Sequence, residues 1–134
     1  MRILLIDDHA LFRIGLRELL ERRGIEVVDA IGDCEFGIQQ VIELQPDVVL
    51  LDMRMPQMSG IEVLRQLRER QQSMSISMLT TSRDEKDVIE SLQSGAQGYL
   101  LKDMEPDDLI MALNDIMQGK TVVAPELTGV LAKA

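Results

Sequence analysis

The stretch VVLLDMRMPQMSG, residues 48–60, sets four consecutive apolar residues directly before an aspartate. A short run that is apolar throughout is typical of a strand buried on both faces of a parallel sheet. Four further runs that are nearly continuous in hydrophobicity occur elsewhere in the chain, at residues 3–6, 27–31, 76–79 and 98–101. Longer segments with helical periodicity separate them, at about residues 10–23, 35–44, 60–71, 84–93 and 105–118.

This fivefold alternation predicts an α/β fold with one doubly wound, five-stranded parallel sheet. We expect the strand order 2-1-3-4-5 of the flavodoxin-like (βα)5 arrangement. Residues 1–118 are expected to form one domain. Residues 119–134, GKTVVAPELTGVLAKA, are expected to be a linker or the start of a following element whose remainder is absent from this chain.

Composition restricts the classes of function. The 134 residues are 46% hydrophobic, enough for one globular core, and carry a net charge of −9. So acidic a chain repels nucleic-acid phosphates, so we expect no direct DNA contact. Cys34 is the only cysteine, which excludes an internal disulfide. With no signal peptide and no long apolar segment, we expect a cytoplasmic protein that does not bind membranes.

Charged and hydroxyl side chains follow four of the expected strands: Asp7, Asp8, Asp52, Thr80 and Lys102. The carboxyl ends of parallel strands meet at one edge of the sheet, where ligands bind. Each pair of carboxylates about 4 Å apart would cost about 4 kcal/mol at an effective dielectric constant of about 20. A hard divalent cation would offset this repulsion, and Mg²⁺ with its oxygen ligands suits the site.

Each of these residues has an ordinary explanation when taken alone. A single aspartate after a strand commonly forms a turn or caps a helix. A threonine is common in strands, and a lysine in a loop is usually solvated. Because all five fall at the same edge of one sheet, the combination indicates a functional site.

The same residues lie in motifs that resemble the receiver domain of two-component response regulators. These motifs are IDD at residues 6–8, VVLLDMRMPQMSG at 48–60, LTTS at 79–82 and GYLLKD at 98–103. IDDH together with GYLLKDMEPDDL most resembles the NarL/FixJ-type transcription regulators, which carry a LuxR-type output. The resemblance covers about residues 2–118.

The resemblance implies a phosphoacceptor with a role for each site residue. Asp52 would accept a phosphoryl group from a sensor histidine kinase. Asp8 would bind Mg²⁺ directly, Asp7 largely through a water, and the backbone carbonyl of Arg54 would complete the protein ligands together with Asp52. Lys102 would pair with Asp52 and then with the phosphoryl oxygens.

The resemblance also implies a switch and an output. Thr80 would move to hydrogen-bond the new phosphoryl group, and the ring of Tyr99 would swing inward behind it. Such a chain is not a turnover enzyme. It would switch transcription regulation, contact DNA only through an output domain absent from this chain, and form a homodimer on phosphorylation.

Three residues depart from the pattern of similar receivers. Asp103 stands where most have a proline joined by a cis bond, and a cis bond without proline costs about 2.5–4 kcal/mol. Thr81 is larger than the residue usual after the switch hydroxyl, and Arg54 puts a long cation beside the site. His9 is expected to occupy an ordinary position at the start of the first helix.

Ile14 and Met111 point away from the apolar stripes of their helices. Scattered exposed apolar residues are ordinary on protein surfaces. The alternative is that Ile14 belongs to a kinase-docking surface and Met111 to an output or dimer surface.

Three other functions compete with the phosphoacceptor. An aspartate-nucleophile phosphatase similar to the haloacid dehalogenases would need an acid at position 54, which is arginine. A flavodoxin-like electron carrier would need aromatic residues to stack a flavin, and Tyr99 is the only Tyr or Trp. A receiver that acts as a protein-interaction module without phosphorylation is the remaining alternative, although the complete acidic set argues against it.

Overall fold

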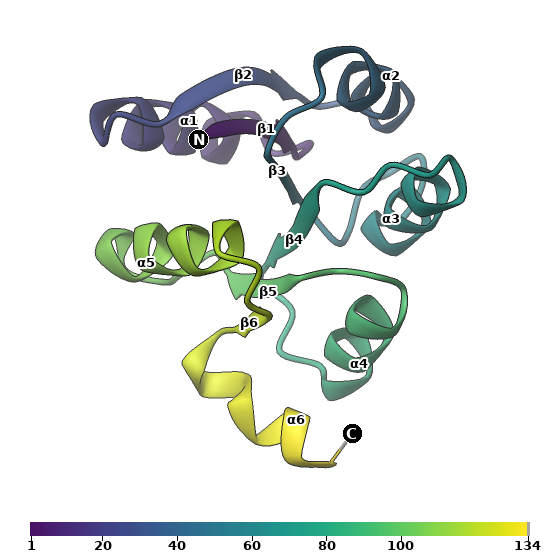
Figure 1. Cartoon of the computed structure of the whole chain (residues 1–134), viewed down its shortest axis with the longest axis vertical. Helices are drawn as coiled ribbons and strands as arrows, with labels where there is room; N and C mark the ends of the chain where they lie inside the picture. The colour runs from purple at the N-terminus through teal and green to yellow at the C-terminus, as the bar shows by residue number, and fades with distance from the viewer. Residues whose placement is uncertain (134) are drawn as a thin grey trace.

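Five β–α units alternate along the chain and form a parallel sheet with helices on both faces (Figure 1). The computed structural model describes residues 1–133, with side chains through residue 130. The strands are β1 (Arg2–Ile6), β2 (Glu26–Ile31), β3 (Val48–Leu51), β4 (Ser75–Thr80), β5 (Gly98–Leu101) and β6 (Val122–Val123). The helices are α1 (Ala10–Arg22), α2 (Cys34–Leu44), α3 (Gly60–Glu69), α4 (Glu85–Gln93), α5 (Pro106–Met117) and α6 (Thr128–Lys133), with a 3-10 turn at Pro125–Leu127.

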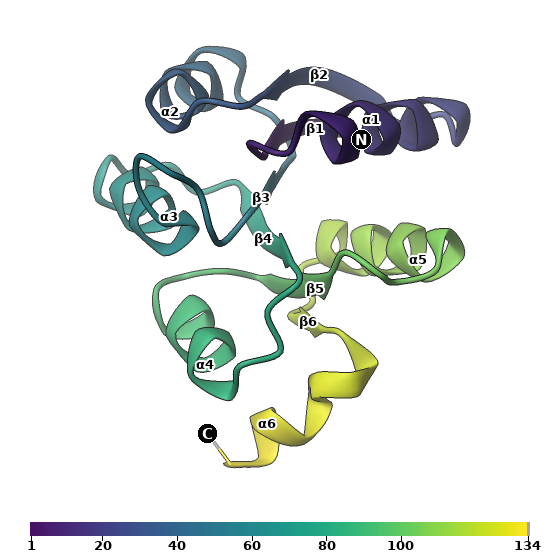
Figure 2. The ribbon, with the colours of Figure 1, turned by 180° about the vertical axis from the view of Figure 1, so that it is seen from behind.

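The sheet has the order β2-β1-β3-β4-β5-β6, with every pairing parallel. The expected order 2-1-3-4-5 is therefore confirmed. Helices α1 and α5 cover one face, and α2, α3 and α4 cover the other (Figures 1 and 2). Side chains of β1 alternate between the two: Ile3 and Leu5 pack in the core under α1 and α5, and Leu4 and Ile6 in the core under the other helices.

The sixth strand is a difference from the expected five. Its two residues pair with β5, and the backbone N–H of Ala124 donates to the carbonyl of Tyr99 at 2.9 Å. A run of two apolar residues is too short to be recognised as a strand from its pattern. Val123 and Leu127 are buried against the core that also contains Val88 of α4, and α6 packs beside α4 (Figure 1). The domain boundary at residue 118 stays a prediction.

Local signals explain where three of the helices begin. The side chains of Asp33, Ser59 and Asp84 accept hydrogen bonds from backbone N–H groups in the first turns of α2, α3 and α4. Two of these caps, Ser59 and Asp84, close the loops that follow β3 and β4. These loops are thereby held at the carboxyl edge of the sheet, where the expected site lies.

Candidate functional site

Three carboxylates meet at the carboxyl ends of β1 and β3. The two strands are neighbours, with Ile6 opposite Leu51, so the residues that follow them lie side by side. The side chains of Asp7 and Asp52 are 8% and 4% exposed, and that of Asp8 is 25% exposed. One ligand atom from each of Asp7, Asp8, Asp52 and His9 lies within 4.8 Å of all the others. The structure therefore brings together the acidic residues that the sequence analysis selected.

Lys102, whose side chain is 9% exposed, brings a positive charge to this cluster. Its Nζ lies 2.9 Å from Oδ2 of Asp7 and 3.5 Å from Oδ2 of Asp52. The ammonium group also sits 4.6 Å from the centre of the Phe12 ring, a cation–π distance. The resemblance implied pairing with Asp52, whereas the shorter contact in this structure is with Asp7. The Lys102–Asp103 bond is trans, like every peptide bond in residues 1–133.

Asp52 is held in an unfavourable environment for a carboxylate. Burial raises the pKa of Asp52 above its ordinary value, and the neighbouring charge of Asp7 raises it further, against the opposing effect of Lys102. Its Oδ1 accepts a hydrogen bond from the N–H of Met53 at 2.9 Å. Its Oδ2 is buried and accepts no hydrogen bond, and the same is true of Oδ1 of Asp8.

The surroundings of these two oxygens show whether Asp7, Asp8 and Asp52 suit a divalent cation. Buried polar atoms are nearly always hydrogen-bonded, so two acceptors without a donor in one cluster call for an electrophilic partner. Carboxylate oxygens are the ligands that Mg²⁺ prefers, and it commonly binds one or two of them together with waters and phosphate. The donor set of Asp7, Asp8 and Asp52 therefore fits a hard divalent cation.

His9 is the site residue that the sequence analysis missed. It does stand at the start of the first helix, as the N-cap of α1, but its ring turns back over the acids. Its Nδ1 lies 3.1 Å from Oδ1 of Asp7, 3.5 Å from Oδ2 of Asp52 and 3.2 Å from Nζ of Lys102. The sequence did contain a sign of this role, because His9 directly follows Asp7 and Asp8. A residue between the end of a strand and the start of the next helix lies at the edge of the sheet, beside the acidic side chains.

The hydroxyl groups of Thr80 and Tyr99 meet at one residue of the loop after β4. Both side chains are buried. Oγ1 of Thr80 accepts a hydrogen bond from the N–H of Ser82 at 3.2 Å, and the Tyr99 hydroxyl donates to the carbonyl of Ser82 at 3.0 Å. Burial raises the pKa of Tyr99, so its hydroxyl stays protonated and can keep donating. The structure thus joins the two residues expected to form a switch.

The Arg54 side chain reaches helix α4. Its guanidinium lies 2.7 Å from Oδ2 of Asp87 on α4. Gly60, at the start of α3, packs directly on the backbone of Asp52, and a Cβ there would overlap the Asp52 carbonyl oxygen. Glycine at position 60 therefore lets α3 approach the strand that carries Asp52.

The two residues selected for partner surfaces are exposed. Ile14 on α1 is 56% exposed, and Met111 on α5 is 65% exposed. Their roles stay predictions. None of the helices within residues 1–133 has the length and apolar character that a bilayer crossing requires.

Comparison with known proteins agrees with this architecture. Residues 3–114 match the family described as the response regulator receiver domain. The nitrate/nitrite response regulator protein NarL of Escherichia coli is 46% identical over 131 residues, which cover 97% of this chain and 61% of that protein. The chain thus spans about three-fifths of the length of this curated relative.

Two solved structures share the fold at 32% sequence identity. A LuxR-family two-component response regulator from an Aurantimonas species superimposes with a TM-score of 0.92, covering 98% of this chain and 95% of that one. The signal receiver domain of the putative response regulator NarL from Mycobacterium tuberculosis has a TM-score of 0.84 and covers 89% and 97%. The chain belongs to the response regulator receiver domain family, with relatives of the NarL type.

Proposed function

We propose that this receiver takes a phosphoryl group from the phosphohistidine of a sensor histidine kinase onto Asp52, with Mg²⁺ as cofactor. The observation that carries the proposal is Oδ2 of Asp52, a buried carboxylate oxygen without a hydrogen-bond donor, 3.5 Å from the ammonium group of Lys102. A carboxylate oxygen in this state is poorly solvated and free to act as a nucleophile.

The chemistry is a single displacement at phosphorus. An Asp52 oxygen bonds to phosphorus while the P–N bond to the histidine breaks, and the leaving nitrogen keeps the electron pair. Phosphoryl transfer needs alignment and neutralisation of the phosphoryl oxygens more than covalent help from the protein. Lys102 supplies a positive charge, and Thr80 supplies a hydroxyl once it leaves the N–H of Ser82.

Asp7, Asp8, Asp52 and the backbone carbonyl of Arg54 would hold the Mg²⁺ ion. When bound, the ion would neutralise charge on the carboxylates and on the transferred group. The two acceptor oxygens without donors, on Asp8 and Asp52, support this assignment. The group stays on the protein as a signal rather than passing to a substrate, so we do not propose a turnover enzyme.

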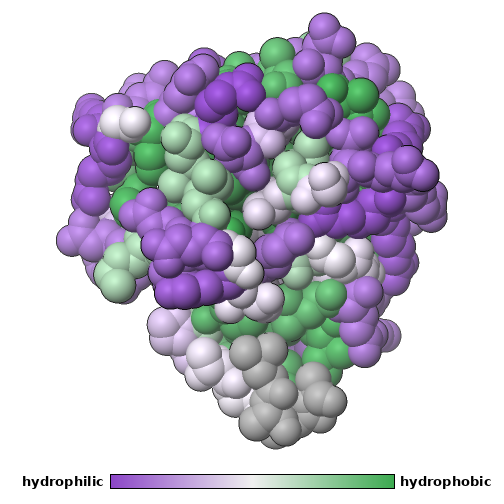
Figure 3. Space-filling model, viewed as in Figure 1, coloured by the Kyte–Doolittle hydropathy of each residue, from purple (hydrophilic) through white to green (hydrophobic). Residues whose placement is uncertain are grey.

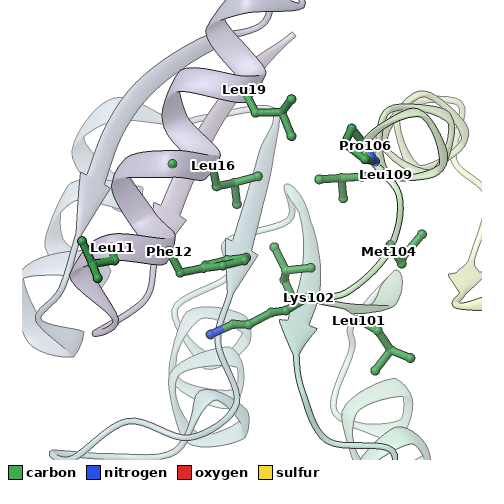
Figure 4. A pocket seen from close by; sticks show the side chains of 11 residues that line it. Leu11, Phe12, Leu16, Leu19, Leu101, Lys102, Met104, Pro106 and Leu109 are labelled. Carbon is green, nitrogen blue, oxygen red and sulfur yellow. The ribbon is translucent and has the colours of Figure 1, made fainter.

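The docking surface that we propose for the kinase is an apolar groove between α1 and α5. The groove has a volume of about 350 Å³ and is lined chiefly by leucines, together with Phe12, Met104 and Pro106. Leu16 and Leu19 of α1 face Leu109 of α5 across it, and Lys102 extends past Phe12 (Figure 4). Apolar residues show among hydrophilic ones on the side of the molecule where α1 and α5 lie (Figure 3). Leu11 and Ile14 of α1 add exposed apolar surface.

The output that we propose is transcription regulation in the cytoplasm. Curated relatives include nitrate/nitrite response regulators and the transcriptional regulatory protein DegU of Brevibacillus brevis. DNA would be contacted by an output domain outside these 134 residues, because the net charge of −9 opposes binding to phosphates. Phosphorylation would favour a homodimer through a surface that includes Met111.

Intact-mass spectrometry tests the acceptor. The protein is incubated with Mg²⁺ and acetyl phosphate, and wild type is compared with Asp52→Asn and with Asp115→Asn, a half-exposed aspartate of α5. One Mg²⁺-dependent phosphoryl adduct is expected on wild type and on Asp115→Asn but not on Asp52→Asn. Wild type without an adduct after a fast quench, with several donors, would favour the receiver that acts without phosphorylation.

A second comparison tests whether Ile14, on the exposed apolar surface of α1, takes part in kinase docking. Ile14→Ala should slow phosphotransfer from the kinase and leave the reaction with acetyl phosphate unchanged. Ile42→Ala, on α2 and away from the groove, serves as the control with a similar side chain. Equal slowing of both reactions by Ile14→Ala would rule out a docking role for this residue.

A further inference from the structure

A hydrogen-bonded network joins the loop that carries Asp52 to helix α4. The guanidinium of Arg54 lies 2.7 Å from Oδ2 of Asp87, and the hydroxyl of Ser82 donates to the same oxygen at 2.6 Å. Asp87 stands in the first turn of α4, and its side chain is only 12% exposed. Both bonds are charge-assisted and short, so this carboxylate ties the loops after β3 and β4 to one helix.

Ser82 also connects this network to both of the expected switch residues. Its N–H is held by Oγ1 of Thr80 and its carbonyl by the hydroxyl of Tyr99. A displacement of Thr80 toward Asp52 would therefore loosen Ser82, and with it one of the two donors to Asp87. The other donor, Arg54, lies two residues after Asp52 in the chain.

Arg54 is placed to respond to a new anion at Asp52. Its side chain is 69% exposed, so packing does not lock it onto Asp87. A phosphorylated Asp52 carries up to two negative charges, one more than the free carboxylate, and presents three strong acceptor oxygens that a guanidinium can bind in bidentate geometry. Asp87 offers one negative charge, and one of its oxygens is already shared with Ser82. The phosphoryl group would be the stronger competitor for Arg54.

We propose that Arg54 binds the phosphoryl group on Asp52 and, in doing so, releases Asp87 and the first turn of α4. This inference rests on the proposed function and adds a phosphoryl-binding residue to it. With unmodified Asp52, Arg54 and Ser82 together hold Asp87. After phosphorylation, Arg54 turns to the phosphoryl oxygens, Thr80 releases the N–H of Ser82, and Asp87 loses its donors.

Competition between Asp87 and the phosphoryl group for Arg54 has a thermodynamic consequence. An ion pair that only stabilised the fold would not have this consequence. If Asp87 and the phosphoryl group compete for Arg54, whatever weakens the bond to Asp87 must strengthen binding of a phosphoryl mimic. Removing Arg54 must have the opposite effect, because it removes a contact to the mimic. The two substitutions are therefore expected to shift affinity in opposite directions.

The test uses beryllofluoride with Mg²⁺, a non-covalent phosphoryl mimic, titrated calorimetrically into the whole chain. Arg54→Gln is expected to weaken beryllofluoride binding about tenfold, the effect of one charge-assisted hydrogen bond, and Asp87→Asn to tighten it severalfold. Arg65→Gln is the matched control, since Arg65 on α3 pairs with Glu90 at 3.2 Å and with Ser94, the C-cap of α4, rather than with the first turn of that helix. It should leave the affinity unchanged.

Hydrogen exchange at the backbone amides of residues 85–93 supplies a second readout. Beryllofluoride should speed exchange in the first turn of α4 in wild type and in Arg65→Gln. In Arg54→Gln the free protein should already exchange faster there, with little further change on binding. Arg54 is largely exposed and Asn is isosteric with Asp, so both variants are expected to fold.

The outcomes separate this inference from the proposed function. Wild type that does not bind beryllofluoride in the presence of Mg²⁺ would count against the phosphoacceptor itself. Wild type that binds, with affinities of Arg54→Gln and Asp87→Asn that are unchanged or shifted in the same direction, would overturn only the role of Arg54.

Discussion

Replacement of Asp52 by asparagine should stabilise the metal-free protein. The side chain is 4% exposed, and Oδ2 accepts no hydrogen bond. Asparagine keeps an oxygen that can accept the N–H of Met53 and places an amide donor beside the carboxylate of Asp7. The substitution removes a buried charge and preserves shape, so packing around β3 should not change.

The expected gain in the free energy of unfolding follows from three contributions: attraction to Lys102, repulsion from Asp7 and the cost of burying the carboxylate. Lys102, at 3.5 Å from Oδ2 of Asp52, attracts it by about 5 kcal/mol at an effective dielectric constant of about 20. A ligand oxygen of Asp7 within 4.8 Å repels it by at least about 3.5 kcal/mol on the same scale. The small net attraction of about 1 kcal/mol does not offset the several kcal/mol that burying a carboxylate costs. We expect Asp52→Asn to raise the free energy of unfolding by about 1–3 kcal/mol.

Urea denaturation in a chelator measures this difference, with Asp115→Asn as a control expected to stay within about 0.5 kcal/mol of wild type. Adding Mg²⁺ at a hundred times its dissociation constant should then stabilise wild type by about 2.7 kcal/mol and the variant by less. An Asp52→Asn protein less stable than wild type in the chelator would refute the reasoning, because it would mean that the attraction to Lys102 outweighs burial.

The raised pKa of Asp52 makes the free energy of unfolding depend on pH, in a direction that can be worked out. The folded state raises the pKa of Asp52 above that of the unfolded chain. Between the two pKa values the folded state binds more protons, so the free energy of unfolding falls as pH rises. The stabilising contribution of Asp52 is therefore fully present at a pH below its pKa in the unfolded chain. It is lost as the pH rises through its pKa in the folded state. In a chelator, wild type should lose stability relative to Asp52→Asn over this window, and parallel pH profiles would contradict the assignment.

Three further predictions concern stability, each measured by urea denaturation. Gly60→Ala should destabilise the protein by about 3 kcal/mol, because its Cβ would overlap the Asp52 carbonyl, whereas Gly15→Ala, at an exposed position of α1, should stabilise it by about 0.5–1 kcal/mol. Leu127→Ala should cost about 2–3 kcal/mol if the segment after α5 belongs to the core; a change near zero would show that it does not. Arg68→Met should cost about 2–4 kcal/mol, because Arg68 donates to the carbonyls of Gln72, Met74 and Gly95; a loss below 1 kcal/mol would mean that water replaces it.

The sequence by itself determined the alternation of strands and helices and the acids at the strand ends. Strands buried on both faces must be apolar throughout, so runs such as residues 48–51 stand out without any knowledge of their neighbours. Parallel strands also leave their carboxyl ends at one edge. Asp7, Asp8 and Asp52 could therefore be grouped before their distances were known, and right-handed crossovers limited the possible strand orders without fixing one.

Only the tertiary structure decided which partners these groups take. Whether Lys102 lies nearer to Asp7 or to Asp52, and where the His9 ring turns, depends on angles between segments far apart in the chain. The contact between Arg54 and Asp87 spans 33 residues. The two residues of β6 have no pattern of their own and become a strand only because β5 offers an open edge. Local periodicity reports the burial of an element, whereas side-chain pairing depends on how the elements pack, and no short stretch of sequence contains that information.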